Sequence, residues 1–326
     1  MIAKEEHLPL STCRICEGAS LTPYSFEEKM FGTCERFDYV ECDNCGCLQI
    51  SEFPVDMSRH YPSHRYYSLE QQNYKSPFRS FSRRARANYA VFREGLIGKF
   101  LFGLKKTVPE LCVYGEVGIK NQDRILDVGG GAGQHTFALR CLGVENALAI
   151  DKFIQDDIEL EGSLLARKAT IEEMEGEFDL IIFHHSFEHM EQQVETLEAT
   201  RSRLSDHGRI VLRIPSVSSY AWEHYRENWV NLDAPRHFFL HSHESIKHTA
   251  ERANLKMTKL WCDSTSFQFW GSEQYKKGII LGAENSYAKG LEASTYLASE
   301  IEEFEHRAKK LNQENRGDWI CVLLEK

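Results

Sequence analysis

The sequence lacks several features that would set it apart from ordinary globular proteins. None of its 326 residues falls in an apolar run of about 20, so we expect no helix that spans a membrane. The first ten residues, MIAKEEHLPL, have no apolar core of the kind that a secretory signal carries. Internal repeats and low-complexity segments are also missing. We therefore expect a cytoplasmic protein with one large domain or two.

Positive charge is scarce and unevenly spread. The 39 Lys and Arg against 49 Asp and Glu give a net charge of −10, which argues against a general nucleic-acid-binding protein. Residues 75–106 nevertheless hold nine Lys and Arg and one acid, Glu94. That segment is +8, so the remainder of the chain is −18.

Cysteine is concentrated at the amino-terminal end, where six of the ten lie within the first 47 residues. Two C-x-x-C pairs can each present two thiolates from a tight turn, and together they predict a closed, structural zinc site. Disulfides or redox pairs are the alternative, but the context that either needs is missing. Two spare cysteines, Cys34 and Cys47, could replace a ligand. The predicted ligands are Cys13, Cys16, Cys42 and Cys45.

The sequence RILDVGGGAG at residues 124–133 is the feature around which the chain is organised. A short apolar run predicts a buried strand, and glycine then recurs at Gly129, Gly131 and Gly133. Such a turn lets the backbone approach a ligand at a helix N-terminus. A dinucleotide fingerprint would need its third glycine where Gln134 stands, so it fits imperfectly. A glycine turn without a ligand is the remaining alternative.

From residue 124 onward, strands and helices alternate in a pattern that predicts an α/β, doubly wound, mostly parallel sheet. The predicted strands are Ile125–Val128, Ala147–Ile150, Leu164–Arg167, Phe178–His184, Arg209–Ile214, Lys256–Cys262 and Trp319–Leu324. The predicted helices lie near Gly133–Leu142, Met190–Leu204, His243–Ala253 and Tyr287–Leu311.

Residues 77–104 predict one amphipathic helix because apolar residues recur at steps of three and four. Its basic residues are either a solvated face of a helix that covers the cofactor, cations for a substrate phosphate, or a contact with an anionic membrane. The apolar face would consist of Phe78, Phe81, Ala85, Tyr89, Phe92, Leu96 and Phe100. In the aromatic loop before it, Tyr61, Tyr66 and Tyr67 either cap a ligand or pack between domains.

Polar side chains follow the predicted strands at the edge where a ligand should bind. Asp151 closes the second strand and can accept hydrogen bonds from two ribose hydroxyls, or it only caps a loop. The fourth strand runs into His184, His185, Glu188 and His189, which either take part in proton transfer or fix the loop.

The insertion at residues 215–241 carries aromatic and charged side chains and is expected to line a substrate pocket. Asp233, Arg236 and His237 would form a polar wall, and His237 is either the general base or a histidine that holds the loop. A substrate whose reacting group is already acidic needs no base to remove its proton. The predicted apolar wall consists of Trp222, Tyr225 and Trp229.

These motifs resemble the class I S-adenosylmethionine (SAM) methyltransferases. Asp127-x-Gly129-x-Gly131-x-Gly133 resembles motif I, and F-D-x₈-E-H over residues 178–189 resembles a signature of members that act on small molecules. The resemblance implies a seven-stranded sheet with its last strand antiparallel at the edge. It also implies that the glycines admit the methionine part of SAM, that Asp127 acts near the amino group and that Asp151 binds the ribose. The cofactor-binding residues would be Asp127, Gly129, Gly131, Gly133, Gln134, Asp151, Lys152, Thr170, Ile171, His184 and His185.

A narrower resemblance is to bacterial methyltransferases of sugar and polysaccharide pathways, which join a two-C-x-x-C zinc module to a SAM domain. It covers residues 13–48 and 120–255 and includes W-x-x-L-D-x-P-R-H at residues 229–237. Some zinc-containing sugar C-methyltransferases have a further carboxy-terminal domain, which favours transfer to oxygen or nitrogen here. The expected domains are a zinc module at 1–55, a linker at 56–118 and a SAM domain at 119–326. The expected catalytic residues are His237, His189, Glu188, Arg236 and Asp233.

Three functions follow from these features. The first is methyl transfer to a small molecule, preferably a nucleotide-linked sugar or saccharide, with phosphates near the basic segment. The second is methyl transfer to a phenol, quinone or peptide-like metabolite. The third is a zinc-ribbon protein that binds or modifies RNA, against which the net charge counts. Peripheral membrane contact stays possible, and the sequence does not indicate an oligomeric state.

Overall fold

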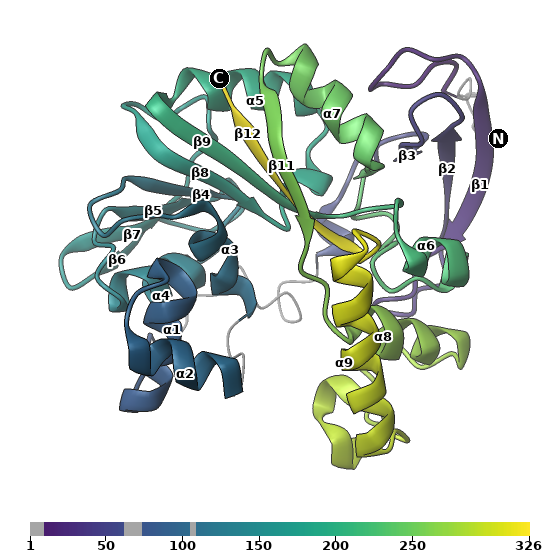
Figure 1. Ribbon diagram of the computed structural model, residues 1–326. Coiled ribbons are helices and arrows are strands. Elements are labelled where there is room, and N and C mark those ends of the chain that lie inside the picture. Colours follow the sequence, from purple (N-terminus) through teal and green to yellow (C-terminus); the bar gives the residue numbers. More distant parts are fainter. Residues whose placement is uncertain (1–9, 62–73, 105–108) are drawn as a thin grey trace.

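The computed structural model describes residues 10–61, 74–104 and 109–326. Within these residues the strands form one sheet of eight and one of four (Figure 1). In those described ranges, no helix is both long and apolar enough to cross a bilayer. Predicted Tyr66 and Tyr67 lie outside the described residues.

The larger sheet has the order β11-β12-β9-β8-β4-β5-β7-β6. Its strands β9, β8, β4, β5 and β7 are parallel, whereas β12 is antiparallel to both neighbours and β6 is antiparallel to β7. The bounds are β4 Ile125–Val128, β5 Ala147–Ile150, β6 Ile158–Leu160, β7 Ser163–Arg167, β8 Phe178–His184, β9 Leu204–Pro215, β11 Lys256–Cys262 and β12 Trp319–Glu325.

This sheet confirms the predicted doubly wound fold and corrects two details. The hairpin strand β6 adds an eighth strand to the seven predicted. The last strand, β12, is antiparallel as expected but does not lie at the edge, because β11 pairs with its outer side. Five consecutive residues of β12 are buried, whereas β11 is largely open to solvent. The more apolar strand therefore takes the inner position.

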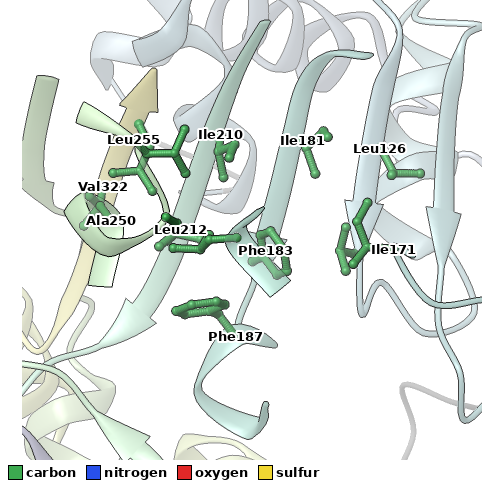
Figure 2. Close-up of a cluster of buried hydrophobic side chains, with 14 of the residues drawn as sticks. Leu126, Ile171, Ile181, Phe183, Phe187, Ile210, Leu212, Ala250, Leu255 and Val322 are labelled. Carbon is green, nitrogen blue, oxygen red and sulfur yellow. The ribbon is translucent and has the colours of Figure 1, made fainter. Parts of the chain in front are cut away.

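Helices cover both faces of the sheet (Figure 1). On one face, α5 and α7 pack against a core that runs across the central strands, where Ile181, Phe183, Ile210 and Leu212 lie together (Figure 2). Residues of α1, α3 and α4 belong to the core of the opposite face. The helices are α1 Phe81–Phe92, α2 Leu96–Leu104, α3 Pro109–Val117, α4 Gln134–Cys141, α5 Gln193–Ser202, α6 Tyr220–Tyr225, α7 His243–Arg252, α8 Phe267–Lys276 and α9 Ala298–Gln313.

The single amphipathic helix predicted at 77–104 is wrong, because Arg93 ends α1 in the left-handed region (φ 58°) and α2 begins at Leu96. The predicted apolar face is also wrong in part, since Phe81, Leu96 and Phe100 are 73%, 85% and 67% exposed. Small residues decide the packing instead. A Cβ on Gly98 would lie 2.4 Å from the Ala85 carbonyl, and one on Gly115 would lie 2.1 Å from the Ala90 carbonyl.

The carboxy-terminal helix is shorter than predicted. Residues 287–297 form the two 3₁₀ turns Tyr287–Lys289 and Leu291–Ala293, and α9 begins at Ala298. Other 3₁₀ turns are Ser58–His60, Phe187–His189 and Arg226–Asn228.

The four-stranded sheet combines three amino-terminal strands with one strand from the insertion at residues 215–241. Its order is β1 (Leu21–Glu27), β2 (Arg36–Cys42), β3 (Leu48–Ile50) and β10 (Phe239–Leu240). The insertion predicted to line the acceptor pocket supplies β10, which pairs antiparallel with β3. The cysteine module and the insertion therefore share one sheet and one hydrophobic core.

Candidate functional site

The glycine turn between β4 and α4 has the geometry that its spacing predicts. Gly129, Gly131 and Gly133 adopt φ values of 74°, 54° and 80°, which side chains rarely tolerate. A Cβ on Gly129 would lie 2.4 Å from the Cβ of Ser186, at the end of β8. Gly133 is the N-cap of α4. The turn is thus pressed against the neighbouring strand, with a helix N-terminus beside it.

Asp127 is the most informative residue of this turn. It is 2% exposed, and neither carboxylate oxygen has a hydrogen-bond partner among the described residues. Burial, together with the nearby Asp151 carboxylate, raises the pKa of Asp127 to about 7. A buried carboxylate without a partner is costly, and an ammonium group would compensate it. The amino group of SAM is such a cation, so this observation fits the predicted cofactor.

Asp151 lies at the end of β5, facing the same turn. Its Oδ2 accepts a hydrogen bond from the Gly131 amide at 3.0 Å, and its Oδ1 accepts one from the Phe153 amide at 2.8 Å. Each carboxylate oxygen keeps a second lone pair for a ligand hydroxyl. The fixed carboxylate therefore suits the ribose contact that the sequence predicts.

The other predicted cofactor residues differ in which of their groups is available to a ligand. The side-chain amide nitrogen of Gln134 is buried and has no hydrogen-bond partner within the described part of the chain, so it can donate to a ligand. The ammonium of Lys152 lies 4.8 Å from the centre of the Phe153 ring. The Thr170 amide donates to the Glu173 carboxylate. Ile171 belongs to the hydrophobic core (Figure 2), which leaves only its backbone for an adenine contact.

His184 and His185 are oriented by a residue that the sequence reasoning missed. Arg213 of β9 is buried and donates to Nε2 of both histidines, at 3.1 Å for His184. The Asp263 carboxylate accepts from Arg213 at 2.6 Å. Burial and the charge of Arg213 hold the pKa of His185 well below its usual range. Both histidines are therefore neutral, and each carries its proton on Nδ1.

The signal for Arg213 was present in the sequence, as a charged residue within the apolar run RIVLRIP. His135 was also missed. It is the second residue of α4, the helix after the glycine turn, and its ring stacks on that of His184 with ring centres 4.2 Å apart. Burial lowers the pKa of His135 to about 4.

Glu188 and His237, which are buried, and His189, which is half-buried, form a second group of polar side chains, which we call the acceptor cluster. Glu188 is fully buried, and its two carboxylate oxygens have no hydrogen-bond partner among the described residues. Burial raises the pKa of Glu188 to about 8. The nearest ring nitrogens are Nδ1 of His185 at 3.5 Å and Nε2 of His237 at 3.9 Å. The structure thus brings these three predicted catalytic residues together, and the carboxylate of a fourth, Asp233, lies 3.8 Å from Nε2 of His237.

Both histidines of the acceptor cluster have a defined tautomer. The Arg236 carbonyl accepts from Nδ1 of His189 at 2.7 Å, and the Asn231 carbonyl accepts from Nδ1 of His237 at 2.8 Å. A carbonyl can only accept, so Nδ1 carries the proton and Nε2 keeps its lone pair. Burial lowers the pKa of His237, and it lowers that of His189 to about 3. The two neutral imidazoles can therefore each use Nε2 to accept a proton or a hydrogen bond, or to bind a metal ion.

The other two predicted catalytic residues are engaged with each other. Arg236 is fully buried and forms ion pairs with Asp233 at 2.6 Å and with Glu28 of the cysteine module at 2.8 Å. The guanidinium thereby links the module to the insertion. This placement does not favour a direct contact between Arg236 and an acceptor, so the predicted catalytic role of the pair stays a prediction.

Tyr61 connects the two halves of the site. Its ring stacks near Phe153, the residue whose amide binds Asp151, with centres 6.4 Å apart. Its hydroxyl lies 3.3 Å from Nδ1 of His189. Of the alternatives for this tyrosine, the position favours a cap over the ligands.

The predicted apolar wall is wrong. Trp222, Tyr225 and Trp229 are buried in the core shared with the cysteine module, where Trp222 packs edge-on against Phe26. The Trp229 indole N–H donates to Asp318. These rings stabilise the junction between the two sheets and do not form an apolar wall for an acceptor, because the module supplies the apolar surface that they cover.

Cys13, Cys16, Cys42 and Cys45 come together as predicted, with their sulfur atoms within 4.8 Å of one another. The distances are 3.7 Å for Cys13–Cys45 and 3.5 Å for Cys16–Cys42. Tetrahedral zinc with Zn–S of about 2.3 Å needs sulfur atoms about 3.8 Å apart, so the four thiols fit this ion. The hydrogen bond with Cys45 lowers the pKa of Cys13 to about 4. The spare cysteines, Cys34 and Cys47, lie outside the cluster.

Comparisons with known proteins bear on the larger sheet. Residues 100–260 match the family model described as "Methyltransferase domain". No curated protein matches the chain. Among solved structures, a SAM-dependent methyltransferase from Archaeoglobus fulgidus is 19% identical, covers 70% of this chain and 99% of its own, and has a TM-score of 0.40.

Two further structures give similar values. The cyclopropane synthase MmaA2 from Mycobacterium tuberculosis is 12% identical, covers 77% of this chain and 100% of its own, and has a TM-score of 0.43. A SAM-dependent methyltransferase from Mesorhizobium loti is 12% identical, with 63% and 91% coverage and a TM-score of 0.39. Values this low carry no argument about activity, so the family assignment rests on the sequence match and on the site geometry above.

Proposed function

Since this chain is a class I SAM-dependent methyltransferase, we propose that its acceptor is a hydroxyl or amine of a nucleotide-linked sugar or saccharide. The observation that carries the proposal is the acceptor cluster. Glu188, His189 and His237 lie beside His185 at the end of β8 and offer polar groups to the acceptor. An apolar acceptor would leave these buried groups without partners, which is costly.

The residues that would hold SAM are those of the β4 and β5 ends. Asp127 would pair with the amino group, Asp151 would accept from the ribose, and the glycine turn would admit the methionine chain. When bound, SAM supplies an electrophilic methyl group on a sulfonium. The protein's own contribution is to orient the acceptor and to manage its proton, because displacement at the methyl group depends mainly on alignment.

The acceptor cluster would activate the acceptor. A hydroxyl or amine that approaches Nε2 of His237 meets a lone pair rather than an N–H, so it can donate its proton in that direction. Tyr61, which contacts both His189 and Phe153, would cover the ligands. The exposed arginines of α1 would meet phosphates of the acceptor.

We also propose that the four thiolates hold one structural zinc ion. Their spacing suits tetrahedral coordination and leaves no ligand position for a substrate. In this proposal residues 1–55 are a zinc module, 56–118 a linker and 119–326 the catalytic domain. Reduced thiols at this site favour the cytoplasm.

Isotope-labelled SAM tests the proposal. The zinc-loaded protein is incubated with labelled SAM and a panel of nucleotide sugars, free saccharides, phenols and short peptides, and methyl incorporation is counted. Incorporation into the sugars supports the proposal, whereas incorporation only into phenols or peptides contradicts it. Calorimetry with S-adenosylhomocysteine (SAH) checks the cofactor site separately, with micromolar binding expected.

A further inference from the structure

We infer that the acceptor cluster is a divalent metal site, in which Glu188, His189 and His237 are the ligands and the acceptor binds at an open position. This inference rests on the proposed function, because it specifies how the cluster activates the acceptor. The metal would be distinct from the zinc of the four thiolates. Its ligands come from the 3₁₀ turn after β8 and from the insertion, which are joined by a hydrogen bond from the Phe238 amide to the Glu188 carbonyl at 2.9 Å.

The first argument is convergence. Each of the three side chains offers one ligand atom, and these atoms lie within 4.8 Å of one another. The Glu188 carboxylate and Nε2 of His237 are 3.9 Å apart. A metal bound at about 2.0–2.2 Å from each atom needs them roughly 3–3.6 Å apart. Small side-chain rotations would therefore complete the site.

The second argument is the tautomer of the two histidines. Metal-binding histidines usually donate their other ring N–H to a carbonyl or carboxylate, which fixes the ring and leaves the ligating nitrogen unprotonated. His189 and His237 both do so, through Nδ1 to the Arg236 and Asn231 carbonyls. A fold that needed only one base would have no need for two histidines oriented in the same way.

The third argument is the balance of buried charge. Arg236 is paired with Glu28 and Asp233, and Arg213 is paired with Asp263. Glu188 remains, with both oxygens buried and without a hydrogen-bond partner among the described residues. Buried carboxylates are normally paired with a cation or bound to a metal. A divalent ion at the convergence point would supply the missing charge.

The donor set indicates which ion would bind. Two imidazoles and one carboxylate suit Zn²⁺, Fe²⁺, Co²⁺ or Mn²⁺ better than Mg²⁺ or Ca²⁺, which prefer all-oxygen sites. Three protein ligands leave positions open for an acceptor oxygen or nitrogen. A metal bound there lowers the pKa of a coordinated hydroxyl, whose proton then passes to solvent. With the metal bound, Nε2 of His237 is a ligand and no longer a base, so the metal takes over from His237 the activation of the acceptor.

Manganese binding tests the inference directly. The protein with its thiolate site filled by zinc is titrated with Mn²⁺ in the presence of SAH, and free Mn²⁺ is followed by electron paramagnetic resonance. SAH is used because it has no sulfonium that could neutralise Glu188. One Mn²⁺ per chain is expected. Loss of an outer-shell partner alone costs roughly 10–100-fold in metal affinity, so Glu188→Gln and His237→Ala, which remove a ligand, should each weaken Mn²⁺ binding by at least that much. His248→Ala on α7, paired with Glu244, is the matched control and should change nothing.

Two results would overturn the inference. One is a wild-type protein that binds no Mn²⁺, Co²⁺ or Zn²⁺ beyond the thiolate ion, a result that does not depend on any variant folding. The other is equal Mn²⁺ binding by wild type, Glu188→Gln and His237→Ala, with SAH binding retained. Because no acceptor is present, the outcome is independent of the substrate class. If protein without the second metal methylated saccharides, the metal site would be contradicted and the proposed acceptor would stand. If the protein bound the metal but methylated no saccharide, the proposed acceptor would be contradicted and the metal site would stand.

Discussion

The cysteine module and the ligand site of the large sheet differ in whether their polar side chains find partners within the protein. The four thiols of the cysteine module face inward on a single point and are closed off by their own turns. At the edge of the large sheet, Asp127 and Glu188 are just as buried, but their carboxylates have no hydrogen-bond partner among the described residues. We call the four thiols the closed group, an arrangement typical of a structural metal site. We call Asp127, Glu188 and the polar residues around them the open group, an arrangement typical of a site that binds a ligand.

The insertion couples the two groups. It supplies β10 to the sheet of the module, and Arg236 reaches Glu28 while the adjacent His237 faces Glu188. The closed group therefore serves as a support for the open one. Variants that damage the closed group should affect stability first, whereas variants of the open group should affect binding first.

The largest effect is expected for Cys42→Ser, which removes one thiolate from the closed group. Structural zinc contributes about 10–16 kcal/mol in isolated zinc-finger peptides, so this variant should lose its metal and much of its stability. Metal analysis and thermal unfolding measure both. Cys34→Ser is the control, because Cys34 is exposed and lies outside the cluster. If Cys42→Ser kept its zinc and its melting temperature, the four-thiolate site would be disproved.

The pH dependence of the ligand-free protein tests the open group. The pKa of Asp127 is about 7 in the folded protein against 3.8 ordinarily, so the folded state holds this proton more tightly than the unfolded chain does. Its contribution to stability is therefore present below pH 4 and lost as pH rises to 7, by at most about 4 kcal/mol. The charge of the nearby Asp151 carboxylate also raises this pKa. Urea unfolding from pH 5 to 8 should show a steeper fall for wild type than for Asp127→Asn, and parallel slopes would contradict the assignment.

Asp127→Asn should also weaken SAH binding. Loss of a charge-assisted hydrogen bond costs about 1.5–3 kcal/mol, which corresponds to roughly 10–100-fold in Kd. The ligand-free variant should be no less stable than wild type near neutral pH, because it removes a buried charge without a partner. Calorimetry measures the affinity. Asp156→Asn is the control, since Asp156 is exposed in the loop after β5. Similar losses in both variants would mean that Asp127 does not contact the cofactor.

The parts of this site that the sequence predicted depend on local patterns. The apolar runs placed β4 and β8 at the observed bounds, and the acids at the strand ends followed from them. The fate of Trp222 and Trp229 could not be predicted, because it depends on the surface that a distant module presents to them. The break at Arg93 was missed for a similar reason. Contacts through Gly98 and Gly115 decide how α1 packs against α2 and α3, and hydrophobic periodicity does not record them.

A smaller effect is expected for Gly129→Ala. The variant has to place a Cβ 2.4 Å from that of Ser186 at φ 74°, so it should lose about 1–3 kcal/mol and bind SAH more weakly. Gly278→Ala is the matched control, because Gly278 has φ 70° but no atom within 4 Å of the added Cβ. Urea unfolding of both separates backbone strain from the clash. Equal losses in the two variants would show that the turn is not pressed against β8.

The smallest effect concerns the basic segment, which belongs to neither buried group. Arg83 and Arg84 are exposed on α1, and exposed charges act weakly and are screened by salt. The double variant Arg83→Gln/Arg84→Gln should raise KM about two- to fivefold for a phosphate-bearing acceptor at low salt and leave KM for an unphosphorylated one unchanged. Lys309→Gln/Lys310→Gln on α9 is the control, because it removes the same charge from another exposed helix. If KM stayed constant while retention on anionic vesicles fell, the segment would contact a membrane, and the phosphate role would be wrong.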